Sequence, residues 1–448
     1  MSVVLFVLLP IEAAAIWSLL GGYLLLPSAM SVDIALLPPL DKSSIPAITT
    51  FLLCWMKGAR SEAPQRSWAI YLCALIFVIS PIFTSFGNSY ELQIADRSIP
   101  GFYALDGIKI ALRNLLTLAP FFVGVRFLSS ENGQAVLLRA LPTAALVYSA
   151  PMLFEIRMSP QLHNWVYGFF PHSFAQQVRD GGFRPVVFLG HGLEVALFAS
   201  MAVVAAVVAA RRRWRLLGVP AGVASIYLTG VLLLCKSMAS IIYVIVAAPF
   251  VIFSSPRTWV NAGLSIVIVV STYPLLRSDN LIPVHHISAA ASKISTDRSA
   301  SFNTRVENED RLLEKANEKP FFGWGTWGRN RIYDEESGRD VSVTDGAWII
   351  QFGSFGWVGY LSLFGLFVSS VLRARIGVRG PVTKATITLG GLTLVLAINL
   401  LDLLPNADLL PFTYVIAGSI AGCLRAKTIK RPHPRLLTRS RPAAALAD

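Results

Sequence analysis

The sequence RVENEDRLLEKANEKPFFGWGTWGRN, residues 305–330, lies within the one long polar stretch of this chain, residues 277–345. That stretch carries ten Lys/Arg and twelve Asp/Glu, which could not sit in hydrocarbon. Strongly apolar segments flank it on both sides. A connection of this length is usually functional or disordered, and its Trp and Gly content argues against disorder. We therefore interpret it as the functional loop of an integral membrane protein.

The composition of the whole chain supports that interpretation. Of its 448 residues, 54% are hydrophobic and only 15% are charged, whereas soluble domains are about a quarter charged. Apolar runs of about 20 residues recur, which is enough for a helix to cross about 30 Å of hydrocarbon. Helices also satisfy their own backbone hydrogen bonds in lipid. The sequence predicts an all-α polytopic membrane protein.

About twelve apolar runs are long enough to count as membrane spans. Pro10 and Glu12 interrupt the first run and the second is short, so eleven or thirteen spans remain open. The predicted spans are residues 3–27, 44–57, 67–85, 105–125, 134–154, 186–210, 216–234, 238–254, 259–276, 346–371, 385–403 and 408–424.

These spans divide the chain into four parts. Residues 1–276 hold transmembrane helices 1 to 9, and residues 277–345 form the loop between spans nine and ten. Residues 346–424 hold the last three helices. Residues 425–448 are a basic tail broken by prolines, which we expect to be disordered and to favour anionic lipid headgroups.

The distribution of Lys and Arg in the short loops predicts the orientation. With the N-terminus inside, the inward links and the tail carry 21 of the 39 Lys/Arg but only three acids. Long loops cross membranes largely regardless of their charge, so the loop is exempt from this rule. We expect both termini in the cytoplasm and the loop on the outer side.

The net charge of +13 does not indicate nucleic-acid binding, because the basic residues are scattered over span ends instead of gathered on one face. Four cysteines, all in or at the ends of apolar spans, form no pattern of a disulfide framework or a metal site. The N-terminus lacks a basic region and a cleavage site, so we interpret it as a retained first span.

Candidate functional residues on the outer side begin with the segment GGFRPVVFLGHGLE, residues 181–194. Arg184 stands before the sixth span and could bind phosphate, while His191 and Glu194 are expected inside that span, one helical turn apart. Ionisable side chains at membrane depth point to function, although an interfacial anchor and a structural polar pair are alternatives. Lys236 and Ser237 occupy a tight outer turn, where contact with a lipid phosphate and simple snorkelling are both open.

The loop supplies the remaining candidates. Arg305 opens a predicted amphipathic helix that Pro320 ends and that Gly323 and Gly325 close. A cation at a helix start is disfavoured by the helix dipole, which favours a functional role for Arg305. Asp345 lies where the loop re-enters the membrane; it could act as a general base or simply cap the tenth span.

Several reaction classes leave no trace in the sequence. We find no Walker A loop, no nucleotide-binding glycine fingerprint, no zinc spacing and no Ser-His-Asp pattern. No cofactor or metal site is therefore predicted.

An arginine before a short helix, then P-x-x-G-x-G, a variable polar stretch and a G-x-x-G helix resembles the superfamily of O-antigen ligases and Wzy-type polymerases. The matching residues are Arg305, Pro320, Gly323, Gly325, Asp345 and Gly356 with Gly359, and Arg184 and Lys236–Ser237 match further family positions. The topology of nearly the whole chain takes part in the resemblance.

The resemblance implies a glycosyltransferase in the bacterial inner membrane with its long loop in the periplasm. It implies transfer of a glycan from undecaprenyl pyrophosphate to a lipid-linked oligosaccharide in a polymerase, or to lipid A–core in a ligase. Arg184 and Arg305 would hold the pyrophosphate, and neither nucleotide sugar nor essential metal is expected. Other polysaccharide-assembly proteins are further candidate partners.

One departure bears on the choice between polymerase and ligase. Many relatives, ligases especially, carry His-Asn where this chain has Asp345–Gly346, and Glu where it has Ser354. The difference favours a polymerase for exopolysaccharide, capsule or O-antigen. A lipid-linked oligosaccharide flippase or other transporter and a non-catalytic scaffold are rivals, although we see none of the internal repeats typical of transporters.

Overall fold

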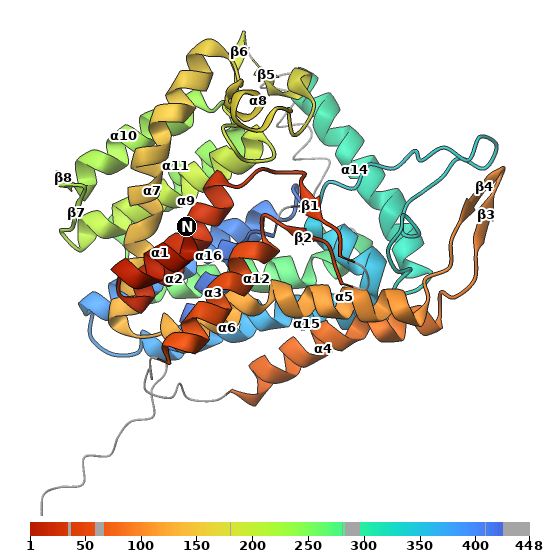
Figure 1. The fold of residues 1–448 in the computed structure, drawn as a ribbon, viewed down its shortest axis with the longest axis horizontal. Coiled ribbons are helices and arrows are strands. Elements are labelled where there is room, and N and C mark those ends of the chain that lie inside the picture. The colour runs from red at the N-terminus through yellow and green to blue at the C-terminus, as the bar shows by residue number, and fades with distance from the viewer. Residues whose placement is uncertain are drawn as a thin grey trace, which may run out of the picture.

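Figure 1 shows a computed structural model of the chain, whose helices pack into one bundle with a helix and two extended segments projecting from one side. It describes residues 1–34, 37–58, 67–179, 181–279, 281–282, 296–407 and 409–423, and of residues 296–302 the backbone alone. The predicted disordered tail, residues 425–448, lies outside the described residues. So does part of the polar loop.

Within the described residues, seven helices are long and apolar enough to cross a membrane, and five shorter apolar helices accompany them. The long ones are α4 (Trp68–Phe86), α5 with α6 (Ala104–Phe127), α7 (Glu131–Met158), α9 (Gly192–Arg211), α12 (Pro256–Ser278), α15 (Ala347–Gly377) and α16 (Lys384–Asp402). The shorter ones are α2 (Ile11–Leu25), α3 (Ser44–Lys57), α10 (Ala221–Leu234), α11 (Met238–Phe253) and α17 (Pro411–Ala421).

The protein is thus a mostly helical integral membrane protein. The number of spans and their orientation stay predictions. The chain is not strictly all-α, because the part of it that the structure describes includes four short antiparallel hairpins between helices. They are β1 (Ser31–Val32) with β2 (Leu40–Asp41), β3 (Leu92–Ile94) with β4 (Arg97–Ile99), β5 (Val178–Arg179) with β6 (Gly182–Phe183), and β7 (Arg215–Leu216) with β8 (Val219–Pro220).

Prolines and polar segments shift several predicted boundaries. The first predicted span is two helices, α1 (Ser2–Leu8) and α2, because Pro10 cannot continue the hydrogen-bond ladder. The predicted span 105–125 is likewise divided into α5 (Ala104–Thr117) and α6 (Ala119–Phe127), and Pro120 lies in the first turn of α6. The predicted span 186–210 becomes helical only at Gly192.

Helix α9 lies at the centre of the bundle, against α7, α10, α11 and α16. Every residue from Val195 to Ala209 is buried, and most of these residues are Ala or Val with small side chains. In lipid there is no hydrophobic drive between helices, so association depends on close van der Waals packing, which small side chains permit. The segment preceding α9 is therefore attached to the most enclosed helix of the protein.

The polar loop is joined to the bundle through a break in α15. Gly356 has φ +60° and ψ −164°, which interrupts the helical ladder at that point. The amides of Trp357 and Val358 donate instead to Pro320 O and Phe321 O, at 2.7 and 3.1 Å. In return, the freed carbonyls of Gly353 and Ser354 accept from the amides of Trp324 and Gly325, both at 2.9 Å.

This exchange explains the P-x-x-G-x-G sequence. A Cβ on Gly323 would lie 2.4 Å from the Ser354 carbonyl carbon, and a Cβ on Gly356 would lie 2.4 Å from Phe321. Both glycines also have positive φ, which other L-residues rarely adopt. The motif therefore fixes the loop to α15 through four backbone hydrogen bonds, and helix α14 (Thr296–Asn317) is carried with it.

Candidate functional site

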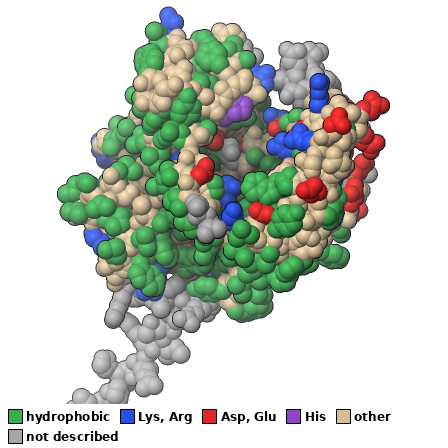
Figure 2. Space-filling view, turned by 45° about the vertical axis from the view of Figure 1, so that its right-hand side comes forward, with side chains coloured by type: hydrophobic (Ala, Val, Ile, Leu, Met, Phe, Trp, Pro, Cys, Tyr) green, Lys and Arg blue, Asp and Glu red, His purple; other side chains and the backbone are tan. Residues whose placement is uncertain are grey.

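A cavity of about 1050 Å³ opens between the loop and the bundle. The space-filling view shows a hollow on this face, with Lys, Arg and His side chains along it (Figure 2). Its walls come from five widely separated segments of the chain. The charged, imidazole and amide side chains that line it are Lys42, His172, Gln176, Arg179, Arg184, His191, Glu194, Arg305, Asn308, Asp345 and Asn406.

Arg184 stands on a segment held by a buried carboxylate at the end of α7. Glu155 accepts hydrogen bonds from the amides of Val186 and Val187, both at 2.7 Å, and from the amide of Leu162 at 2.9 Å. Glu155 is fully buried, so these amides replace water around its charge. The guanidinium of Arg184 donates to the carbonyl of Lys236 at 3.1 Å, which directs it along the cavity wall.

The sequence predicted His191 inside the sixth span. In the structure it precedes the helix, as the N-cap of α9. Its Nδ1 accepts from the amide of Leu193 at 3.0 Å, so the ring proton is on Nε2, which faces Gln176 Oε1 at 3.3 Å. Burial lowers the pKa of His191 to about 4, and nearby Arg184 and other cations add to the effect. His191 is therefore a neutral hydrogen-bond donor at neutral pH and has no free nitrogen to act as a base.

Glu194 lies in the first turn of α9, where the helix dipole favours a carboxylate. Its Oε2 accepts from the amide of Gly190 at 2.9 Å, which closes the turn that leads into the helix. The sequence placed His191 and Glu194 together as a polar pair, but in the structure each caps backbone amides at the start of α9.

Arg305 and Asp345 form an ion pair at the mouth of the cavity. Arg305 Nε lies 3.0 Å from Asp345 Oδ2, and the two side chains are 40% and 34% exposed. The expectation that Arg305 opens its helix was wrong, because α14 begins at Thr296. Asp345 is not the helix cap either: Gly346 is the N-cap of α15 and makes no side-chain cap.

Helix α14 is held by a buried arginine at the end of α12. Arg277 NH2 lies 2.6 Å from Asp310 Oδ1, and Arg277 Nε lies 4.0 Å from Glu309 Oε2. Burial raises the pKa of Glu309 to about 7, although Arg277 and Trp348 act against the shift. Since Glu309 and Asp310 follow Arg305 by about one helical turn, this contact determines where Arg305 stands.

The structure brings Arg184, His191, Glu194, Arg305 and Asp345 to one cavity. The other four candidates lie elsewhere. Lys236 is behind the wall, where its Nζ donates to the carbonyl of Arg179 at 2.8 Å and anchors the β5–β6 hairpin. Ser237 is buried and donates to Ser240 Oγ at 3.3 Å, and Gly323 and Gly325 join the loop to α15.

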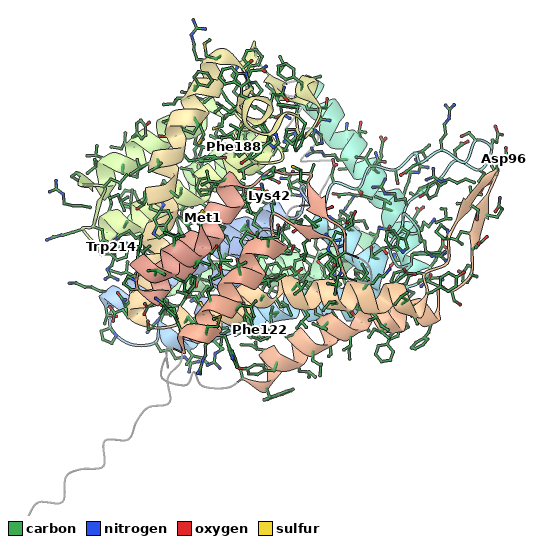
Figure 3. The ribbon with its side chains drawn as sticks, in the orientation of Figure 1. Met1, Lys42, Asp96, Phe122, Phe188 and Trp214 are labelled. Atoms are coloured by element: carbon green, nitrogen blue, oxygen red, sulfur yellow. The ribbon has the colours of Figure 1, made fainter. Side chains whose placement is uncertain are left out.

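Three residues that the sequence did not single out take part in the site. Lys42 donates to Ser28 Oγ at 2.9 Å and to the Phe188 carbonyl at 3.4 Å, which places it at the cavity wall (Figure 3). Arg179 lines the cavity from the β5–β6 hairpin, and Glu155 supports the segment of Arg184. In the sequence, the one signal for Lys42 and Arg179 was that they lie in predicted outward loops. No sequence pattern indicated that Glu155 contacts the segment of Arg184.

The lining has a positive balance. Among the lining residues that the structure describes, Lys42, Arg179, Arg184 and Arg305 face two carboxylates, Glu194 and Asp345, and His191 is neutral. Low-dielectric walls strengthen such a field, so the cavity suits an anionic ligand, and planar guanidinium groups suit phosphate in particular. Among the described residues no group of three or more His, Cys, Asp or Glu side chains could hold a metal ion.

These observations define a class of protein: a helical integral membrane protein with a cationic cavity between a polar loop and the helix bundle. Within it, residues 223–364 match the family model described as O-antigen ligase. The match runs from α10 into α15 and includes Lys236, Arg305 and Asp345, whereas Arg184 precedes it. It confirms the resemblance to the O-antigen ligase and Wzy superfamily. No curated protein matches the chain.

Proposed function

We propose that this protein is a membrane glycosyltransferase of the Wzy polymerase type. It transfers a glycan from an undecaprenyl-pyrophosphate-linked donor to a lipid-linked oligosaccharide, in the synthesis of exopolysaccharide, capsule or O-antigen. It lies in the bacterial inner membrane with both termini in the cytoplasm and residues 277–345 in the periplasm. The observation that carries this proposal is the cavity in which Arg184 and Arg305, from distant segments, lie with Asp345.

The reaction needs few groups. The acceptor hydroxyl oxygen forms a bond to the anomeric carbon of the donor sugar, and the bond from that carbon to the pyrophosphate oxygen breaks. The electron pair leaves with the pyrophosphate, whose growing charge is stabilised by Arg184 and Arg305. The hydroxyl proton passes to a carboxylate, to which we assign Asp345. Holding donor and acceptor together supplies the rest, and no metal takes part.

The ion pair of Arg305 and Asp345 supports this assignment. The pair places a proton acceptor beside a phosphate ligand, so that one bound substrate can meet both groups. When pyrophosphate takes up the hydrogen bonds of Arg305, Asp345 is left to accept the hydroxyl proton. His191, with its proton on Nε2, donates a hydrogen bond to the substrate and takes no proton.

The family description favours a second candidate, an O-antigen ligase that transfers the glycan to lipid A–core. A deletion strain separates the two when surface polysaccharide and lipid-linked intermediates are resolved on gels. Accumulation of single repeats on their carrier supports the polymerase. Full-length polymer left on its carrier, with bare lipid A–core, indicates the ligase. If every polysaccharide profile is unchanged, both the polymerase and the ligase are contradicted. The transporter and the scaffold are then the better explanations.

Point variants test the site itself. Arg184→Ala, Arg305→Ala and Asp345→Asn should each abolish complementation of the deletion while the protein still accumulates in the membrane. Arg311→Ala is the matched control, because Arg311 is an exposed arginine on the same helix as Arg305 and does not line the cavity. Full activity of the three site variants would support a scaffold. Transfer that continues in the presence of a chelator supports metal independence.

A further inference from the structure

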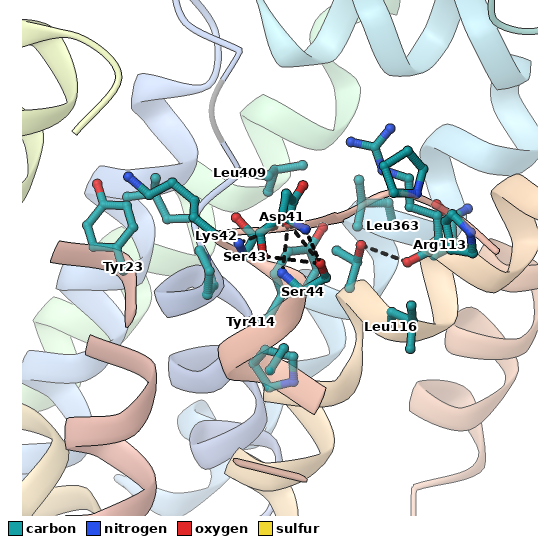
Figure 4. A pocket seen from close by; sticks show the side chains of 18 of the residues that line it. Tyr23, Asp41, Lys42, Ser43, Ser44, Arg113, Leu116, Leu363, Leu409 and Tyr414 are labelled. Atoms are coloured by element: carbon teal, nitrogen blue, oxygen red, sulfur yellow. Dashed lines mark hydrogen bonds between the residues drawn. The ribbon is translucent and has the colours of Figure 1, made fainter. Parts of the chain in front are cut away.

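A second cavity, of about 340 Å³, adjoins the first inside the bundle. The two cavities share three lining residues, Lys42, Glu194 and Ala407, so a ligand group in one lies next to a ligand group in the other. Figure 4 shows its side chains converging from the start of α3, from α5, from α15 and from α17. Nothing in the transfer reaction described above uses this space.

Helix α5 carries a polar stripe, of which only Arg113 and Thr117, in the C-terminal half of the helix, line the second cavity. Asp106, Lys109, Arg113 and Thr117 follow one another at intervals of three or four residues, which places them along one face of the helix. Arg113 is the tenth residue of α5 and lies about 14 Å along the helix from its first residue. A cation at such a position within a membrane-spanning unit is costly unless it serves a purpose.

Two other polar side chains of the second cavity, Asp41 and Asn114, are hydrogen-bonded to the protein itself. Asp41 Oδ1 accepts from the amides of Ser43 and Ser44 at 2.9 and 2.8 Å and so holds the start of α3. Asn114 Nδ2 donates to the carbonyl of Phe77 at 3.0 Å. The guanidinium of Arg113, in contrast, makes no hydrogen bond or ion pair with any residue that the structure describes. Its five donors are available to a ligand.

We propose that the second cavity binds the phosphate of the acceptor, the lipid-linked oligosaccharide that supplies the hydroxyl, through Arg113. This inference rests on the proposed function and adds a second phosphate site to it. The donor pyrophosphate already has four cations in the first cavity. Lys42 and Glu194 both stand at the junction, and each cavity also has cations of its own, Arg113 in the second and Arg179, Arg184 and Arg305 in the first. The two cavities can therefore hold two separate anions.

This arrangement implies an order along the substrates. The acceptor is held by its carrier phosphate at Arg113, and its glycan bends back past Lys42 and Glu194 toward Asp345. The distal sugar then presents its hydroxyl to the donor in the first cavity. Two lipid carriers thus bind one protein at the same time, which is what a polymerase needs, since both of its substrates are linked to carriers.

The first test measures binding and needs no turnover. Undecaprenyl pyrophosphate is added to the purified protein in detergent and the complex is weighed by native mass spectrometry. We expect two molecules bound to the wild type, one to Arg113→Gln and one to the double variant Arg184→Ala with Arg305→Ala. Lys109→Gln is the matched control, one helical turn away and outside the cavity, and should bind two. A wild type that binds a single molecule overturns the proposal.

The second test measures transfer between a defined donor and a defined acceptor. Arg113→Gln should raise the KM for the acceptor about tenfold, as expected for loss of one charged hydrogen bond, and leave the KM for the donor unchanged. Arg113→Lys should restore part of the loss. An unchanged KM for the acceptor, or a raised KM for the donor alone, overturns the acceptor site. Failure of the proposed function gives a different result from failure of the acceptor site, because the wild type itself would then transfer no glycan.

Discussion

The two arginines of the cavity stand on walls that are held in different ways. The wall of Arg184 continues into α9, the central helix, and is fixed by the buried carboxylate of Glu155 through three amides. The wall of Arg305 belongs to the loop, which is held by backbone hydrogen bonds to α15 and by the ion pair of Arg277 with the half-exposed Asp310. One wall therefore continues into the most enclosed helix, whereas the other is attached to the bundle through backbone hydrogen bonds and ion pairs.

The difference suggests how the cavity works. In the proposed reaction, the first wall keeps Arg184 in place and the second keeps the pair of Arg305 and Asp345 in place. Changes that damage one wall at a time separate the two contributions.

Glu155→Ala should have the largest effect. It leaves three backbone amides without an acceptor, two of them buried, at a cost of roughly 3 kcal/mol or more in the free energy of unfolding. The segment of Arg184 then loses its shape, and transfer should be abolished. Thermal unfolding in detergent and a transfer assay measure both effects. Glu131→Ala, at the exposed start of the same helix, is the control, and an unfolding midpoint equal to wild type in Glu155→Ala would refute a fixed wall.

Gly323→Ala should damage the loop wall as a whole. The residue has φ +67°, which costs a residue with a Cβ about 1–2 kcal/mol, and the added Cβ would collide with the backbone of Ser354. The exchange of hydrogen bonds with α15 should break and the loop should become sensitive to protease. Gly168→Ala, a glycine of similar φ with open space around it, controls for backbone strain alone. Equal protease sensitivity of the two variants would contradict the prediction.

Asp310→Asn should loosen the position of Arg305 alone. The ion pair with Arg277 is lost, but Asp310 is half exposed, so the bundle should stay intact. We expect about a tenfold loss in transfer, which corresponds to about 1.4 kcal/mol, with an unfolding midpoint close to wild type. Asp334→Asn, on an exposed part of the loop, serves as control. A fall in the midpoint as large as that of Glu155→Ala would show that the two walls are not independent.

The smallest expected effect is a dependence on pH of opposite sign in the two walls. The pKa of Glu309 is about 7 in the docked loop against 4.5 for a free carboxyl, so docking binds a proton and weakens as pH rises through 7. The pKa of His191 is about 4 against 6.5, so its wall is most stable above pH 6.5 and weakens as pH falls toward 4.

Two variants separate these contributions. In the wild type, the unfolding midpoint should fall between about pH 5.5 and 8, a range around the Glu309 pKa of about 7. Glu309→Gln should remove this fall. The wild-type unfolding midpoint should also rise from acid to neutral pH because of His191. His191→Asn, which keeps an N-cap side chain, should remove this rise. The midpoint is followed in detergent across the range. Identical pH profiles in wild type and both variants would mean that neither group titrates where its surroundings indicate.

Much of the architecture could be predicted from the sequence, because the length and apolarity of a segment are enough to make it a helix in lipid. The grouping of Arg184, Arg305 and Asp345 also came from the sequence, through a family pattern. Gly323 and Gly325 were predicted to close the helix after Pro320, but their part in attaching the loop to α15 was not predicted. That attachment is made by backbone groups of residues 320–325 with partners on α15 about 30 to 40 residues away, and backbone hydrogen bonds leave no mark in side-chain identity.

The sequence by itself determined that this is a helical membrane protein with one polar loop, since hydropathy is a sum over neighbouring residues. Only the tertiary structure decided which charges meet. Glu155 supports the segment of Arg184, and Arg277 holds the helix of Arg305. Arg113 lines a cavity, and its guanidinium has no hydrogen-bond or ion-pair partner among the described residues. Pairing depends on distances in space between segments far apart in the chain, and those distances are set by the packing of the whole bundle.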